Sequence, residues 1–157
     1  MFRTRNILYI KEYQELPGHE PKARYMIVIH NNGGNSIYLS TTTSQLKLPS
    51  YHQGKHGCID DQTNGIHCFK IPKDVVVGQT NNFSFALDSY VYVANDVFFK
   101  NSMHMSKKYG DVGLIEIKDQ MHESIFGELV YCIYKNIHLK RGIKRELETI
   151  LESIFNK

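Results

Sequence analysis

The sequence has few of the features that would exclude a small globular protein. It has no apolar run near the roughly 18 residues that a membrane-spanning helix needs, no repeat at solenoid spacing and no low-complexity segment. Its first residues contain no long apolar segment followed by a small-residue cleavage site, so no signal peptide is predicted. With 157 residues, of which 41% are hydrophobic and 22% charged, the chain is expected to form one soluble domain.

Cysteine is scarce, and the number and spacing of the cysteines indicate in which cellular compartment the protein is expected. The three cysteines, Cys58, Cys68 and Cys132, are odd in number and lack the regular spacing of a disulfide framework. Reduced thiols are typical of the cytoplasm, where cellular reductants keep cysteines from pairing. The sequence therefore predicts a cytoplasmic protein with reduced cysteines.

The chain also lacks a strong excess of charge of one sign. Its formal net charge is +3, which is compatible with a polyanionic partner but does not by itself indicate one. A basic cluster near the end of the sequence contains Lys140, Arg141, Lys144 and Arg145. We interpret this cluster as the solvated face of a helix, with a nucleic-acid contact as the alternative.

Short strands joined by turns are predicted over the first two thirds of the chain. Runs rich in β-branched and aromatic residues predict strands at 6–13, 24–30, 36–43, 66–71, 83–85 and 90–99. Proline and glycine mark the turn after the first strand, and Asn-Asn-Gly-Gly-Asn predicts a hairpin turn before the third. A long polar loop of the kind that carries function is predicted at 44–65. This spacing of strands favours an antiparallel sandwich or barrel.

The last third of the chain has helical periodicity. Apolar residues at three- and four-residue steps predict amphipathic helices at 118–137 and, after Gly142, at 143–155. The second apolar stripe is expected to be buried on the chain's own core, with a partner-docking surface as the alternative. The fold prediction is α+β, mainly β: a single domain with a β-barrel core at 1–117 and a C-terminal helical region at 118–157.

Three segments of the sequence carry a family resemblance. The first is Gly-His-Glu-Pro-Lys-Ala-Arg at 18–24, which leads into an apolar strand. The second is a strand that ends in threonines at 37–42, followed by a loop with lysine and proline at 45–50, and the third is the strand at 87–97. In this order they resemble the MazF/PemK/Kid toxin family over residues 6–137. The resemblance implies an SH3-like small antiparallel β-barrel, usually a homodimer, that acts as an endoribonuclease and is neutralised by a protein antitoxin.

The resemblance also implies catalytic residues. Arg24 and Thr42 would stabilise charge on the phosphate, and Glu20 or His19 would act as the base. These residue types suit the chemistry, because a guanidinium grips two phosphate oxygens and a carboxylate or imidazole can be tuned to carry a proton near neutral pH. The reaction would need no metal or cofactor and would leave a 2′,3′-cyclic phosphate and a 5′-hydroxyl. The alternative is that Arg24 is a surface charge and Thr42 a strand residue.

Side chains that bind RNA are expected in the loops around these residues. The candidates are Lys22, Ser44, Lys47, Tyr51 and Lys55. Single-stranded RNA would lie across a groove between two subunits, and its unpaired bases would be read by loop side chains, with Tyr51 as the candidate for stacking. The tyrosines in apolar strands are interpreted as packing residues instead; they are Tyr25, Tyr38, Tyr90 and Tyr92.

The chain departs from the family at several positions, and these departures define a second hypothesis. Tyr25 follows Arg24 where the family usually has proline. Val93 and Asn95 stand where some members carry a catalytic arginine and aspartate. Neither side chain can perform that chemistry. The alternative is therefore an RNA-binding or protein-interaction module that keeps the barrel but has no turnover.

Potential metal ligands gather between residues 52 and 68. They are His52, His56, Cys58, His67 and Cys68. Structural zinc sites generally use better-spaced pairs, and adjacent residues in a strand, such as His67 and Cys68, point to opposite faces of a sheet. We therefore expect no metal here, and a metal-dependent hydrolase at this stretch is a third alternative.

Overall fold

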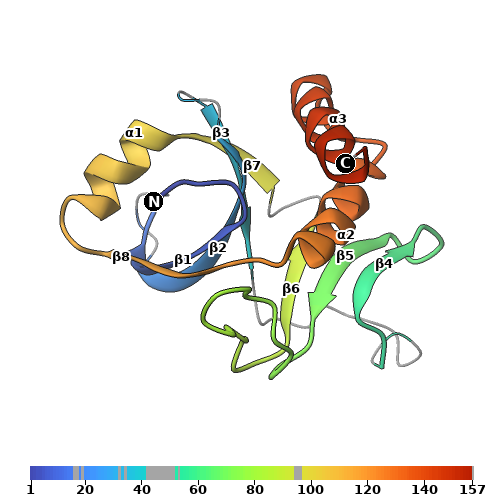
Figure 1. Ribbon diagram of the computed structural model, residues 1–157, viewed down its shortest axis with the longest axis horizontal. Helices are drawn as coiled ribbons and strands as arrows, with labels where there is room; N and C mark the ends of the chain where they lie inside the picture. The colour runs from blue at the N-terminus through green and yellow to red at the C-terminus, as the bar shows by residue number, and fades with distance from the viewer. Residues whose placement is uncertain are drawn as a thin grey trace.

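The computed structural model describes residues 1–156 except 16, 17, 19, 32, 34, 42–51, 53 and 94–96. It is an α+β structure, mainly β, in which two antiparallel sheets pack with two C-terminal helices (Figure 1). The strands are β1 (Asn6–Tyr13), β2 (Lys22–Asn31), β3 (Asn35–Ser40), β4 (Gly57–Asp61), β5 (Ile66–Ile71), β6 (Ser89–Tyr92), β7 (Val97–Asn101) and β8 (Ile115–Gln120). The helices are α1 (Ser102–Met105), the π-helical segment η2 (Ser106–Gly110), α2 (Glu123–Tyr134) and α3 (Arg141–Phe155).

The larger sheet has five strands in the order β7-β3-β2-β1-β8 and is strongly curved (Figure 1). Both of its faces are covered, which explains why β1 and β2 contain continuous apolar runs rather than a strict alternation. Ile27 and Ile29 point into the main core, whereas Met26 and Val28 pack on the opposite face with Met105 of α1 and Tyr109 of η2.

The main core lies between the large sheet, the small sheet and the C-terminal helices. The small sheet has the order β4-β5-β6, and α2 contacts β4 and β5. The apolar stripe of α3 joins this core through Ile143, Leu147 and Ile150, which are buried. The expected burial of the second helix on the chain's own core is therefore confirmed.

Asp119, at the end of β8, anchors the irregular segment between β5 and β6. Its carboxylate accepts hydrogen bonds from the backbone N–H groups of Thr80, Asn81 and Phe83 at 2.9–3.1 Å. Burial would raise the pKa of this carboxyl, but these backbone donors outweigh burial and hold the pKa below its ordinary value. Gly78 lies against the same carboxylate, where a Cβ would be 2.0 Å from Asp119 Oδ2.

Several predicted boundaries are corrected by the structure. Residues 115–120 form β8, so the helix predicted at 118–137 begins only at Glu123. The strand predicted at 90–99 is divided between β6 and β7, which belong to different sheets. The loop predicted at 44–65 contains β4, and the strand predicted at 83–85 is reduced to an isolated bridge at Ser84. Helix α1 and η2 were not predicted.

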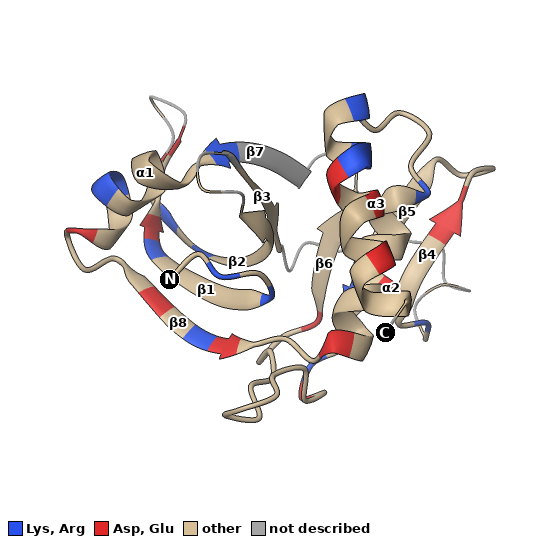
Figure 2. Ribbon diagram, turned by 45° about the horizontal axis from the view of Figure 1, so that its top comes forward, with Lys and Arg blue, Asp and Glu red and all other residues tan. Residues whose placement is uncertain are grey.

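The α+β, mainly β class and the C-terminal helices are confirmed, and the described strands form two separate sheets. Basic and acidic residues are interspersed over the sheets and helices, with basic residues at the start of α3 (Figure 2). The side chains in the basic cluster of α3, Arg141, Lys144 and Arg145, are exposed. This agrees with a solvated helix face. Within the described residues, none of the helices is long and apolar enough to span a membrane.

Candidate functional site

Arg24 is held in a defined orientation near the start of β2. It lies opposite Ile10 of β1, and its Nη1 donates a hydrogen bond to Ser40 Oγ at the end of β3, at 3.2 Å. Ser40 pairs with Met26, two residues along β2 from Arg24, so all three side chains share one face of the sheet. Arg24 is half-buried, so its side chain has restricted freedom near the start of this central strand.

Two neighbouring hollows meet at Arg24. The first, of about 470 Å³, is lined by residues 13–15, Gly18, Glu20, Lys22 and Arg24. The second, of about 500 Å³, is lined by aromatic and small residues that include Tyr9, Tyr25 and Thr41. Lys22 and Arg24 line both hollows, so two cations stand on the boundary between them. We call this surface the Arg24 groove.

Glu15 lines the Arg24 groove and is surrounded by basic side chains. Its carboxylate lies 2.9 Å from Lys100 Nζ, 3.1 Å from His104 Nε2 and 2.8 Å from Lys108 Nζ. Tyr109 also donates its hydroxyl hydrogen to the same carboxylate. Burial would raise the pKa of Glu15, but these hydrogen bonds outweigh it and lower the pKa to about 2. Glu15 is thus a fixed anion that joins the end of β1 to β7, α1 and η2.

The ring of Tyr13 forms part of the wall of the Arg24 groove, and the buried Tyr109 lies against it. The rings of Tyr13 and Tyr109 are stacked, with centroids 5.6 Å apart. Burial raises the pKa of Tyr13, the nearby Glu15 charge raises it further, and Arg24 opposes both. Tyr13 therefore remains a neutral phenol at physiological pH and offers an aromatic surface beside the cations.

The structure brings together three of the predicted site residues. Glu20, Lys22 and Arg24 line the first hollow, and both Glu20 and Lys22 are exposed. Lys55 is exposed in the turn before β4 and lines neither hollow, so it is not grouped with them. The other candidates lie outside the described residues; they are His19, Thr42, Ser44, Lys47 and Tyr51.

Three residues of this site were missed by sequence reasoning. Ser40 and Thr41 directly precede the predicted Thr42. The run of hydroxyl side chains from 40 to 43 is the sequence feature that could have indicated them as site residues. Glu15 had no such signal, because its partners His104 and Lys108 are 89 and 93 residues away in the sequence. The packing role predicted for the strand tyrosines is confirmed for Tyr38 and Tyr90, which are buried.

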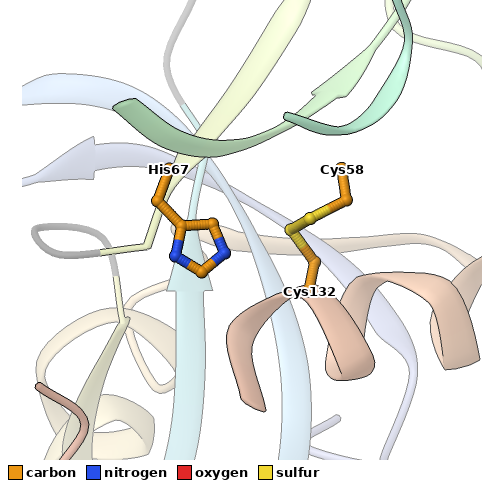
Figure 3. A group of neighbouring side chains, drawn as sticks. All are labelled: Cys58, His67 and Cys132. Atoms are coloured by element: carbon orange, nitrogen blue, oxygen red, sulfur yellow. A yellow bond between two sulfur atoms is a disulfide. The ribbon is translucent and has the colours of Figure 1, made fainter. Parts of the chain in front are cut away.

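A second group of reactive side chains lies at the small sheet. Cys58 of β4 and Cys132 of α2 form a disulfide, with His67 of β5 beside it (Figure 3). The prediction of reduced cysteines is therefore wrong for this pair, because the fold joins two residues separated by 74 positions. Cys68 is a free thiol, and burial raises its pKa to about 11 despite the opposing charge of Lys70.

Comparison with protein-family models and with curated proteins found no relative of this chain. No known protein family matches the chain, and no curated protein shows significant similarity to it.

Proposed function

We propose that this chain is a toxin-like endoribonuclease that binds single-stranded RNA in the Arg24 groove and cleaves it without a metal ion. The observation that carries the proposal is that Lys22 and Arg24 stand between two adjoining hollows. Single-stranded RNA presents a row of anionic phosphates with unpaired bases beside them, which suits cations placed between recesses. The proposed fold is an SH3-like small β-barrel with C-terminal helices.

Electrostatics support an anionic ligand at this groove. Two acidic side chains line the groove: Glu20 is the proposed base, and Glu15 is already bonded to Lys100, His104 and Lys108. Lys22 and Arg24 are not neutralised by this carboxylate, and a phosphate can approach them. The bond from Arg24 to Ser40 orients the guanidinium, which has five N–H donors, and leaves donors for two phosphate oxygens.

In the proposed reaction the RNA supplies its own nucleophile. The 2′-hydroxyl gives its proton to Glu20 or His19, its oxygen bonds to phosphorus, and the bond from phosphorus to the 5′-oxygen breaks. The departing 5′-oxygen takes up a proton from the other of these two side chains, so the products carry a 2′,3′-cyclic phosphate and a 5′-hydroxyl. Arg24 and Thr42 stabilise the charge that develops on the phosphate oxygens.

The biological setting follows from this activity. The proposed protein works in the cytoplasm as a homodimer, with RNA lying across the groove between the two subunits, and is neutralised by a cognate protein antitoxin. Cells that express it are expected to grow slowly, and Arg24→Ala is expected to restore growth. Arg145→Ala removes an exposed cation of α3 and is the matched control.

One observation favours the second candidate, an RNA-binding or protein-interaction module without turnover. Val93, which stands where some members of the MazF/PemK/Kid family carry a catalytic arginine, is 2% exposed and belongs to the main core. A side chain buried there by packing offers no group to the substrate. On this hypothesis the Arg24 groove binds RNA and leaves it intact.

The test is to incubate the purified protein with a long unstructured RNA in the presence of EDTA and to map the new ends. The proposal predicts discrete cuts with 5′-hydroxyl ends. Loss of one transition-state donor commonly costs about 100- to 1,000-fold in rate, so Arg24→Ala should cut at least 100-fold more slowly, with Arg145→Ala unchanged. Intact RNA with folded wild-type protein, or equal cutting by Arg24→Ala, would contradict the proposal.

A further inference from the structure

The disulfide at the small sheet has a third member, His67. Cys58 and His67 lie on the same face of the β4–β5 pair, because Cys58 pairs with Phe69, two residues along β5 from His67. This face packs against α2, which contributes Cys132 (Figure 3). One sulfur or nitrogen atom from each of the three side chains lies within 4.8 Å of the other two. Three separate elements thus bring a histidine and two cysteines to one point.

The disulfide alone does not explain why the ring of His67 is placed beside it. The Nε2 atom of His67 is buried and has no hydrogen-bond partner among the described residues. Figure 3 shows the imidazole ring with an edge turned towards the two sulfur atoms. A buried polar nitrogen without a partner costs free energy, and a disulfide sulfur offers it only a weak interaction. A metal ion bound between the sulfurs and the ring would satisfy this nitrogen.

We propose that Cys58, His67 and Cys132 form a zinc site in the reduced protein, and that the disulfide is the oxidised, metal-free form of the same site. Two thiolates and one imidazole are a ligand set that Zn²⁺ uses in proteins. Ligand atoms around tetrahedral zinc are about 3.8 Å apart, given Zn–S bonds of about 2.3 Å. The three ligand atoms of the chain lie within 4.8 Å of one another, at most about 1 Å beyond that separation, and reduction allows the two sulfurs to move apart.

A hollow borders the cluster at His67. It has a volume of about 590 Å³, and its walls include Asp60 and His138. A water molecule from this hollow would complete a tetrahedral site, which is the arrangement of zinc sites with three protein ligands. The hollow shares no lining residue with the Arg24 groove. The zinc site is therefore independent of the proposed RNA chemistry.

The conversion between the two forms is a balanced exchange. A dithiol reductant gives two electrons and two protons to the disulfide, which yields the thiols of Cys58 and Cys132 and an oxidised, cyclic disulfide of the reductant. Binding of Zn²⁺ then displaces both thiol protons, because thiolate is the form that binds metals. In the disulfide form, Cys132 Sγ lies 3.6 Å from the main-chain oxygen of Cys68, which can accept a hydrogen bond from the Cys132 thiol after reduction.

The zinc form also fits a reducing compartment. Cytoplasmic reductants disfavour structural disulfides, whereas a Cys₂His zinc site is stable there. In either form the same cross-link joins β4 to α2, so that the packing of the main core is maintained when the redox state changes. Oxidation would release the ion without removing the covalent connection between the two elements.

The experiment is a titration of the reduced, metal-free protein with Co²⁺, followed by displacement with Zn²⁺. The proposal predicts the near-ultraviolet thiolate bands and the visible bands of a tetrahedral cobalt site, with one ion per chain, and no such bands for protein oxidised with a diazene thiol oxidant. Cys58→Ser and Cys132→Ser should abolish the thiolate bands. His67→Ala should weaken binding at least about 100-fold, since even outer-shell changes cost 10- to 100-fold.

Two variants serve as controls. Cys68→Ala removes a thiol outside the cluster, and His138→Ala removes a histidine of the hollow that is not one of the three ligands; both should bind Co²⁺ as the wild type does. Circular dichroism follows the fold throughout. If reduction unfolds the apo protein, Zn²⁺ should refold it. Absence of the cobalt bands, failure of Zn²⁺ to restore the fold, or unchanged binding by His67→Ala would each overturn the proposal.

Discussion

Replacement of Glu15 by glutamine is expected to destabilise the protein in a manner that depends on pH. Glu15 accepts hydrogen bonds from Lys100, Lys108 and Tyr109, and its side chain is only 10% exposed. These donors hold β1, β7 and η2 together around one anion. A glutamine keeps the shape of the side chain but removes the negative charge, so the variant isolates the electrostatic part of the interaction.

The expected magnitude follows from the pKa of Glu15. The folded-state pKa is about 2, against an ordinary value of 4.5, and one pH unit corresponds to about 1.4 kcal/mol. Because the folded-state value is lowered, the stabilisation is present above about pH 4.5 and is lost as the pH falls towards 2. Glu15→Gln should therefore lower the free energy of unfolding by about 3 kcal/mol at pH 7, and by less than half of that at about pH 3.

Urea unfolding of the wild type and Glu15→Gln at a series of pH values measures this difference. Glu12→Gln, which changes an exposed glutamate of β1 close to Glu15 in the sequence, is the control and should have little effect at any pH. A destabilisation that is equal at pH 3 and pH 7 would contradict an electrostatic role for Glu15. So would a loss below about 0.5 kcal/mol at neutral pH, which is typical of an ordinary surface substitution.

Three further predictions concern other parts of the molecule. Gly78→Ala should lower the midpoint of thermal unfolding, because its Cβ would be 2.0 Å from Asp119 Oδ2 and would separate the carboxylate from the amides that it holds; an unchanged midpoint, followed by circular dichroism, would show that the segment relaxes freely. Lys22→Ala should remove one phosphate contact. The slope of log affinity for single-stranded RNA against log salt concentration should therefore become less negative by about 0.7. A slope equal to that of the wild type would exclude Lys22 from the interface. Arg24→Lys keeps the charge but loses the planar pair of donors, so single-turnover cleavage should fall at least about tenfold while RNA binding changes little. Equal rates for the two proteins would show that paired donors are not needed.

The strands that sequence reasoning placed correctly are those with strong local signals. β1 and β5 have the predicted bounds, because each is an apolar run that ends at turn-forming residues. β8 was missed because the helical stripe of α2 was extended backwards across it. Its alternation of isoleucine with charged residues is the pattern of an edge strand, and β8 is at the edge of the large sheet.

In the candidate site, too, residues close together in sequence could be grouped by prediction, and residues far apart in sequence could not. Glu20, Lys22 and Arg24 are neighbours in sequence, so one turn and one strand suffice to bring them to a single hollow. The cations around Glu15 and the pairing of Cys58 with Cys132 depend on the complete fold. Spacing alone cannot predict such contacts, because the residues approach only when distant strands and helices have packed.

Cleavage by the 2′-hydroxyl of the RNA can be tested by changing the RNA instead of the protein. Once a cut has been mapped, a substrate with a single 2′-deoxynucleotide on the 5′ side of that cut removes the proposed nucleophile and leaves every phosphate in place. We predict that the protein binds this substrate as it binds the all-RNA strand but does not cleave it at that position. Cleavage that persists at the deoxynucleotide, or wild-type protein that binds RNA and never cuts it, would contradict the proposed mechanism.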